Sequence, residues 1–232
     1  NKPHHHSQPD PFRKIGTHHT HTYEVQSSDE PMDIFRDFES ENRAILDLLC
    51  LPEGASVLDI GCGTGRFVRF AAAAGLKPFC ADISPVMLDY VRSKAEQEGR
   101  GEIITQHAGF MTVDFPPESF DAVVASLSLH HLPDLWKLPA LIKIAGMLKP
   151  EGQFIMRDVV FSVQPGHAPD DVFEQFVESL PTMRKEVARH VSDEFSTYDW
   201  SMEGLLIRAG FKILSVNKLS DSFFVYHSEK VT

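Results

Sequence analysis

The stretch VLDIGCGTG at residues 57–65 decides the fold. Its first four residues form an apolar segment, three alternating glycines follow, and a helical pattern begins at Arg66. Glycine permits backbone angles closed to other residues and lets the chain approach a ligand closely. The free amides at the start of the next helix favour polar or anionic ligand groups. The stretch therefore predicts a strand, a ligand-binding turn and a helix.

The spacing of the glycines narrows the choice of ligand. A dinucleotide-binding fingerprint aligned on Gly61 and Gly63 requires its third glycine at position 66, where Arg66 stands. This mismatch disfavours a nucleotide-dependent oxidoreductase. Neither GxxxxGKS nor GxxxxGKT occurs in the sequence, which excludes a P-loop.

An acidic residue follows at the end of the next apolar segment. Asp82 lies 17 residues beyond Gly65, where a carboxylate can accept hydrogen bonds from ribose hydroxyls. The alternative is that Asp82 caps the following helix, but Ser84 suits that role and is expected to leave Asp82 free for the ligand. An adenosine-containing ligand is therefore expected.

Short apolar segments alternate with helical ones on either side of the glycine turn. Strands separated by helices of about 10 to 15 residues indicate βαβ units and a parallel sheet covered on both faces. The sequence predicts an α/β fold with a doubly wound sheet of seven strands, mostly parallel, that ends in an antiparallel hairpin. The strands are expected at 57–60, 77–81, 102–106, 120–126, 153–159, 211–216 and 222–227, and helices at 66–74, 84–98, 135–148 and 200–208.

The sequence begins with a segment that differs from the rest. Residues 1–28 contain six of the twelve histidines and no hydrophobic period. Such a tract can bind a transition metal, but a flexible, solvated arm is the favoured interpretation. Residues 29–232 are expected to form one domain that starts with an amphipathic helix between Asp33 and Leu49.

A second irregular segment interrupts the rhythm at about 162–198. Apolar residues recur there at helical spacing, as at Phe173, Phe176 and Leu180, and predict two helices. They form either an edge pair or a small helical cap over the carboxyl ends of the strands, where ligands of open α/β folds bind.

Composition limits the partners. The 33 acidic and 22 basic residues give a net charge of −11 without a basic cluster, which disfavours nucleic acid. The spacing of Cys50, Cys62 and Cys80 matches neither a disulfide framework nor a zinc site, which indicates a reducing compartment. No apolar run approaches the roughly 20 residues needed to span a bilayer. A cytoplasmic protein without membrane association is expected; the oligomeric state is not indicated.

Four stretches resemble the class I S-adenosylmethionine (SAM)-dependent methyltransferases, especially the small-molecule branch grouped as methyltransferase domain 11 or 25. They are LDIGCGTGRF at 58–67, ADISPVML at 81–88, FDAVVASLSLHHL at 120–132 and LKPEGQF at 148–154. The resemblance covers most of residues 53–160. It implies a Rossmann-like domain, SAM as cofactor, S-adenosylhomocysteine as product, and a small-molecule methyl acceptor.

The resemblance also implies contacts to the cofactor. The glycine loop and the end of the fourth strand would contact the methionine part, the acid after the second strand would hold the ribose, and two apolar side chains would face the adenine. Ala108 and Gly109 replace the acid that the family commonly presents to the adenine, which weakens a side-chain contact there. The implied cofactor-binding residues are Asp59, Gly61, Cys62, Gly63, Gly65, Asp82, Ile83, Gly109, Phe110, Ser126 and Leu127.

A catalytic side chain is optional for methyl transfer, because the sulfonium donor is already activated and the protein supplies mainly orientation. An acceptor hydroxyl or protonated amine benefits from a base, and His130 and His131 follow the fourth strand near the expected methyl group. Alternatively, His131 is a structural residue that hydrogen-bonds the backbone.

Further polar residues are candidates for the acceptor pocket, namely Arg157, Asp158, His190 and Tyr198. Outside the amino-terminal arm, paired His, Asp or Glu residues are not expected on one helix face, and no metal site is predicted.

The leading hypothesis is a SAM-dependent methyltransferase that acts on a small metabolite. The alternatives are a SAM-binding protein that does not transfer methyl groups, such as a sensor or partner subunit, and, less favoured, an oxidoreductase. Protein or RNA methylation is a third possibility, against which the acidic charge counts for RNA.

Overall fold

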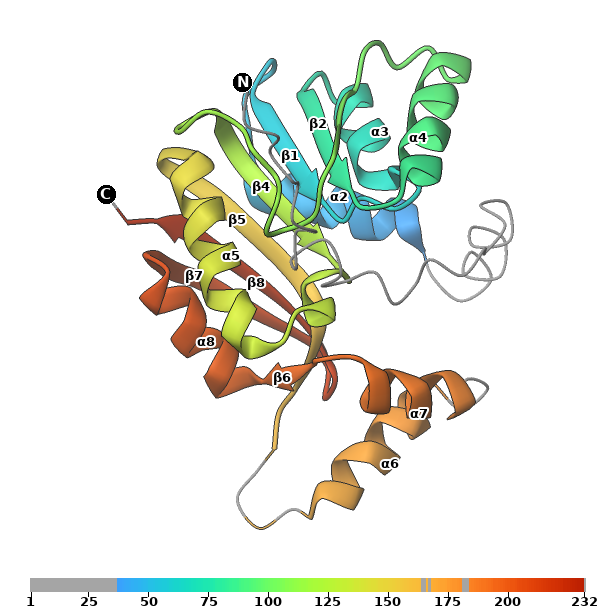
Figure 1. Ribbon diagram of the computed structural model, residues 1–232, viewed down its shortest axis with the longest axis vertical. Helices are drawn as coiled ribbons and strands as arrows, with labels where there is room; N and C mark the ends of the chain where they lie inside the picture. The colour runs from blue at the N-terminus through green and yellow to red at the C-terminus, as the bar shows by residue number, and fades with distance from the viewer. Residues whose placement is uncertain (1–36, 164–165, 167, 181–183, 232) are drawn as a thin grey trace, which may run out of the picture.

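A twisted, mostly parallel sheet forms the centre of the molecule (Figure 1). The structure is a computed structural model that describes residues 37–163, 166, 168–180 and 184–231. The histidine-rich arm predicted at 1–28, and the first turn of the helix predicted from Asp33, lie outside these residues.

The sheet confirms the predicted doubly wound topology. Its strand order is β3-β2-β1-β4-β5-β8-β7, with the first five strands parallel and the last two antiparallel to their neighbours. Parallel neighbours require crossover connections, which the helices supply. The strands are β1 (Ser56–Ile60), β2 (Lys77–Asp82), β3 (Ile104–His107), β4 (Phe120–Ser126), β5 (Leu148–Phe161), β6 (Thr197–Tyr198), β7 (Phe211–Ser220) and β8 (Phe223–Lys230).

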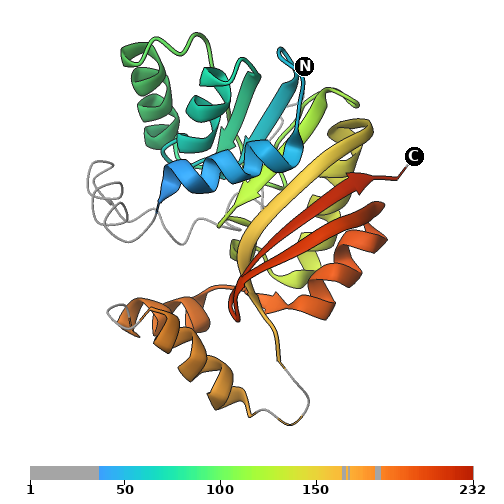
Figure 2. The same cartoon turned by 180° about the vertical axis from the view of Figure 1, so that it is seen from behind.

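Helices cover both faces of the sheet, as Figures 1 and 2 show from opposite sides. One face packs on α5 (Asp134–Met147) and α8 (Asp199–Arg208), the other on α2 (Phe38–Leu49), α3 (Arg66–Ala73) and α4 (Pro85–Gln97). Neighbouring residues of the central strands point to opposite faces, so Val123 joins one apolar core and Val124 the other. Within the described ranges, no helix is both long and apolar enough to cross a membrane.

Three strands extend beyond their predicted ends. β5 begins at Leu148 instead of 153, because Leu148 already pairs with Phe120 of β4. A bulge follows, in which Glu151 has a φ of 60°, and the pairing resumes in a shifted register at Gln153. β7 and β8 continue to Ser220 and Lys230, although the apolar pattern ends earlier. The backbone hydrogen bonds between β7 and β8 extend both strands. β7 is an edge strand whose side chains are mostly exposed, so its apolar pattern does not mark its full length.

The two helices predicted between 162 and 198 are present as α6 (Pro169–Ser179) and α7 (Arg184–Asp193). They extend from the carboxyl end of β5 (Figures 1 and 2). Phe176 and Val187 pack with Val159 of β5 in a small apolar core, against which Leu127 also packs. This position favours a cap over an edge pair. We refer to residues 162–196 as the cap.

The chain returns from the cap through β6, a two-residue strand that the sequence did not indicate. Thr197 and Tyr198 pair with Val160 and Phe161 of β5. Lys137 of α5 is 1% exposed and donates to Asp134 Oδ1 at 2.9 Å and to the carbonyl oxygen of Phe195. Thr197 Oγ1 donates to Asp134 Oδ2 at 2.8 Å. Helix α5 therefore fixes the segment by which the cap rejoins the sheet.

Replacing Lys137 tests this attachment. Lys137→Met retains the apolar stem but removes the donor to Asp134 Oδ1 and to the Phe195 carbonyl, which costs about 1–3 kcal/mol. Hydrogen exchange is expected to become faster at residues 194–198 and to remain unchanged in β1 and β4. Lys212→Met, at an exposed position of β7, is the control. Unchanged exchange at 194–198 in Lys137→Met would show that this lysine does not anchor the cap.

Candidate functional site

A cleft of about 400 Å³ opens between α2, the loop after β1 and the end of β4. Its volume falls in the range of small-molecule sites. It lies at the carboxyl ends of the central strands, the edge where open α/β sheets bind ligands. The lining residues are Phe38, Glu41, Asn42, Ile45, Asp59, Gly61, Cys62, Gly63, Thr64, Arg66, Phe67, Met87, Ser126, Leu127 and Arg157.

The three glycines of the loop differ in what surrounds them. All have positive φ: 76° at Gly61, 50° at Gly63 and 71° at Gly65. A β-carbon on Gly61 would lie 2.5 Å from Ser128 Cβ, and one on Gly65 would lie 2.5 Å from Val91 Cγ2. At Gly63, no atom of the described residues lies within 4 Å of that position. Two glycines therefore let the loop pack on the protein, and Gly63 leaves space at the cleft.

Asp82 fixes the loop to the end of β2. Its Oδ2 accepts a hydrogen bond from the Gly63 amide and its Oδ1 one from the Ser84 amide, both at 2.8 Å. Ser84 also caps α4, since its side chain accepts from the Met87 amide. The predicted capping role of Ser84 is therefore confirmed, while Asp82 holds the amides of Gly63 and Ser84. Each carboxylate oxygen still has a second acceptor position for a hydroxyl.

Asp59 is the unusual acid of the cleft. It is 3% exposed, and its Oδ1 has no hydrogen-bond partner among the described residues. Burial, together with the negative charge of Asp82, raises the pKa of Asp59 to about 8. A buried carboxylate of this kind is stabilised by a positively charged ligand group. The amino and sulfonium groups of SAM carry such charge, so Asp59 fits the cofactor that the sequence implies.

The other implied cofactor residues lie in two places. Cys62, Ser126 and Leu127 line the cleft, and Leu127 has a left-handed backbone with a φ of 52°. Ile83 and Gly109 lie together beyond β2, where a β-carbon on Gly109 would be 2.9 Å from Ile83 Cγ2. Phe110 is buried in the core on the α5 face, which disfavours the expected stacking of its ring on the adenine.

Helix α2 supplies the cleft residues that the sequence reasoning missed. Arg157, a predicted acceptor contact, lines the cleft, and its Nη2 donates to Glu41 Oε1 at 2.9 Å. The Arg66 guanidinium lies 4.1 Å from the centre of the Phe38 ring. In the sequence, the feature that could have indicated this role of α2 was Asn42, a polar residue on the apolar face of the amphipathic helix. It is buried in the structure.

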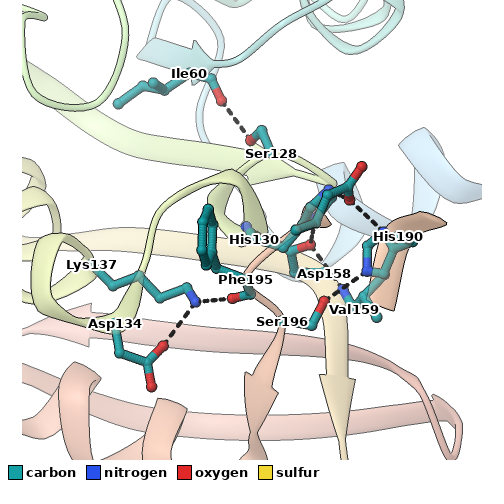
Figure 3. Close-up of polar contacts among 11 residues, drawn as sticks. Ile60, Ser128, His130, Asp134, Lys137, Asp158, Val159, His190, Phe195 and Ser196 are labelled. Carbon is teal, nitrogen blue, oxygen red and sulfur yellow. Dashed lines mark hydrogen bonds and ion pairs between the residues drawn. The ribbon is translucent and has the colours of Figure 1, made fainter. Parts of the chain in front are cut away.

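A second polar group lies between the sheet and the cap. We name His130, Asp158, His190 and Glu194 the junction cluster; Figure 3 labels its first three members. His130 Nδ1 contacts Asp158 Oδ1, and its Nε2 lies 2.9 Å from Glu194 Oε2. His190 Nδ1 contacts the same Glu194 oxygen, and its Nε2 lies 2.7 Å from Ser196 Oγ.

The charged neighbours of His130 change its pKa, and this bears on its expected role as a general base. Burial lowers the pKa of His130, but the charges of Asp158 and Glu194 outweigh this effect and raise it to about 9. A histidine that is protonated at neutral pH cannot accept a proton there, which disfavours His130 as the general base. His131, its partly buried neighbour, has its ring centre 4.3 Å from that of His130.

Of the four predicted acceptor contacts, only Asp158 and His190 are brought together, both in the junction cluster. Arg157 lines the cleft, whereas Asp158 is buried and hydrogen-bonds His130. His190 belongs to the junction cluster. Tyr198 is exposed on β6 and stacks on Trp200, with ring centres 5.9 Å apart.

The expectation that no paired metal-binding residues share a helix face is wrong. His190 and Glu194 are four residues apart at the end of α7, and with His130 they place three potential ligand atoms within 4.8 Å of one another. The spacing was readable in the sequence, but the approach of His130 depends on the fold.

Comparisons with known proteins identify the family of the chain. Residues 57–152 match a family of methyltransferase domains. The chain is 30% identical over 175 residues to a demethylmenaquinone methyltransferase of Bacillus licheniformis, covering 73% of this chain and 71% of the relative. It is 31% identical over 154 residues to the 27-O-demethylrifamycin SV methyltransferase of Amycolatopsis mediterranei, covering 65% of this chain and 54% of the relative.

The fold is also found among solved structures. A SAM-dependent methyltransferase from Aquifex aeolicus aligns with a TM-score of 0.64 and 18% identity, covering 89% of this chain and 97% of that chain. The doubly wound sheet and the glycine loop thus define a Rossmann-like α/β protein. The chain belongs to the class I SAM-dependent methyltransferase family, whose cofactor is SAM.

Alanine substitutions separate the roles of the glycines. Gly63→Ala is expected to cost about 1–2 kcal/mol through its left-handed backbone, and to weaken SAM binding at least tenfold because its methyl group enters the cleft. In Gly65→Ala the new methyl group also clashes with Val91. This variant is therefore expected to lose about 1–3 kcal/mol more unfolding free energy than Gly63→Ala. Urea denaturation and SAM titration measure the two effects.

A double variant provides the control. Val91→Ala removes the two methyl groups that lie nearest the new β-carbon, so it should restore part of the stability lost in Gly65→Ala. Equal stability of Gly63→Ala and Gly65→Ala would contradict this division of roles.

Proposed function

We propose that this protein transfers the methyl group of SAM to a small-molecule acceptor that binds between the cleft and the cap. The observation that carries the proposal is the buried Asp59 carboxylate, whose Oδ1 lacks a hydrogen-bond partner among the described residues. Acceptor identity belongs to the cap and loops, which differ among proteins that share one fold.

The residues of the cleft match the parts of the cofactor. Asp59 would hold the cationic end, Gly63 would permit close approach of the backbone, and Asp82 would offer its remaining acceptor positions to the ribose. Ile83 and Gly109 flank the position expected for the adenine. When bound, SAM supplies a methyl group that is already activated by its sulfonium. The protein contributes orientation and exclusion of water.

A small-molecule acceptor is supported by three observations. The two relatives described above act, by their names, on demethylmenaquinone and 27-O-demethylrifamycin SV. The net charge of −11 disfavours a nucleic acid. The cap adds apolar side chains next to Leu127, one wall of the cleft, which suits an acceptor with apolar surface.

The reaction depends more on positioning than on proton transfer by His130. Its two ring nitrogens face Asp158 and Glu194, so its part is structural. Arg157, in contrast to His130, lines the cleft, and its guanidinium forms an ion pair with Glu41 of α2. We propose that this ion pair shapes the acceptor side of the cleft.

Transfer of labelled methyl groups tests the proposed function. The protein is incubated with methyl-labelled SAM and a cell extract divided into a filtrate below 1 kDa and a macromolecular fraction. Label is expected in organic compounds of the filtrate, with Gly63→Ala as the variant that reduces transfer. Label in protein or RNA would contradict a small-molecule acceptor. SAM binding without transfer to either fraction would indicate a binding protein.

The pKa of Asp59 provides a test that needs no acceptor. In the unfolded chain Asp59 ionises near its ordinary pKa of about 3.9, and in the folded protein at about 8. Its contribution to stability is therefore complete below about pH 4 and is lost as the pH rises through 8. Asp59→Asn is neutral throughout, so its advantage in unfolding free energy over the ligand-free wild type should grow between pH 5 and pH 9.

The expected growth exceeds about 1.4 kcal/mol, the value of one pKa unit. Urea denaturation at the two pH values measures it, and saturating SAM should stabilise the wild type more than the variant. Asp121→Asn, which removes a partly buried acid paired with Lys149, is the control for general effects of charge. A difference between Asp59→Asn and wild type that is the same at both pH values refutes the assignment.

A further inference from the structure

Three side chains of the junction cluster converge on one point between the sheet and the cap. One ring nitrogen of His130, one of His190 and a carboxylate oxygen of Glu194 all lie within 4.8 Å of one another. The nitrogens that face Glu194 are His130 Nε2 and His190 Nδ1. We propose that these three atoms bind a divalent transition-metal ion of the Zn²⁺ class. Two imidazoles and one carboxylate form a ligand set found in three-ligand zinc sites, which keep a further position for water or another oxygen.

The spacing of the atoms suits such an ion. Zinc bonds of about 2.0–2.1 Å in tetrahedral geometry place ligand atoms roughly 3.3 Å apart. Glu194 Oε2 lies 2.9 Å from His130 Nε2 and also contacts His190 Nδ1. The two imidazole rings have their centres 4.9 Å apart. Small rotations of these side chains are therefore sufficient to coordinate an ion.

A second, independent observation is that the ring nitrogen of each histidine that does not face Glu194 has another partner. A metal-binding histidine usually donates its other ring N–H to a carboxylate, carbonyl or water, which orients the ring. His130 has Asp158 in this position, and His190 has Ser196 Oγ at 2.7 Å. Asp158 is itself fixed by the amides of His130 at 3.0 Å and Val159 at 2.8 Å. Both rings thus direct one nitrogen toward Glu194 and have the other occupied.

The cluster is enclosed, and its backbone is fixed. The side chains of His130, His190 and Glu194 are 8%, 15% and 10% exposed. The Phe195 amide donates to the carbonyl oxygen of His130 at 2.8 Å, and Lys137 donates to the carbonyl oxygen of Phe195 (Figure 3). A divalent cation would also offset the two carboxylates that this buried site contains.

The competing interpretation is a metal-free latch, in which His130 bridges Asp158 and Glu194 as an ion pair. Both interpretations use the same contacts, but only the first requires uptake of a metal. A tract such as residues 1–28, with its six histidines, can also bind transition metals. The experiment must therefore compare proteins that share that segment.

Metal content of the 232-residue chain tests the proposal. Wild type, Glu194→Gln and His190→Gln are stripped with a chelator, loaded with Zn²⁺ and dialysed, and bound zinc is measured. Glu178→Gln, an exposed position of α6, is the matched control. Wild type and control are expected to retain one zinc more per chain than the two variants, and zinc should raise their Tm by a larger amount. Equal zinc content in all four proteins overturns the proposal.

A measurement on the wild type alone avoids the effects of a misfolded variant. Crystals soaked with Zn²⁺ are examined for anomalous scattering at the zinc absorption edge. A peak within bonding distance of His130 Nε2 and His190 Nδ1 is expected. Peaks confined to other histidines, or no peak in the junction cluster, overturn the proposal. This test is independent of methyl transfer.

Discussion

The loop after β1 and the turn after β4 approach so closely that no β-carbon fits between Gly61 and Ser128. Ser128 Oγ completes this contact by donating to the carbonyl oxygen of Ile60 at 2.9 Å. The two strands are central neighbours in a parallel sheet, so their carboxyl ends lie at the same edge. The cofactor loop, the cleft wall and the turn that contains His130 all depend on this contact.

The cleft and the junction cluster are joined through the ends of β4 and β5. Leu127 lines the cleft and packs against the apolar core of the cap, and its amide donates to the carbonyl oxygen of Arg157 at 2.7 Å. The next residue of β5, Asp158, belongs to the junction cluster. Because adjacent strand residues point to opposite faces, one strand end serves both sites. A change in the cap therefore reaches the cleft through a few contacts.

The features predicted correctly from sequence are those with a local signal. Glycine spacing predicts the loop, and alternating apolar segments predict the parallel sheet and its hairpin. The cleft contacts that were missed join distant residues, such as Arg157 and Glu41. The unpaired oxygen of Asp59 and the two backbone partners of Asp82 arise only from packing. Strand β6 has two residues, too few for any periodic pattern.

The cap leaves the sheet after Phe161 and returns at Thr197, where β6 pairs with β5 through Val160–Thr197 and Phe161–Tyr198. Its ends are therefore separated by about one strand spacing, roughly 4.8 Å, whatever lies between them. The entropy of closing such a loop grows only slowly with length, by about 0.6 kcal/mol for each doubling. Changes in the length of the loops that join the cap helices can thus be accommodated at small entropic cost, which lets these loops diversify in length during evolution while the sheet stays unchanged.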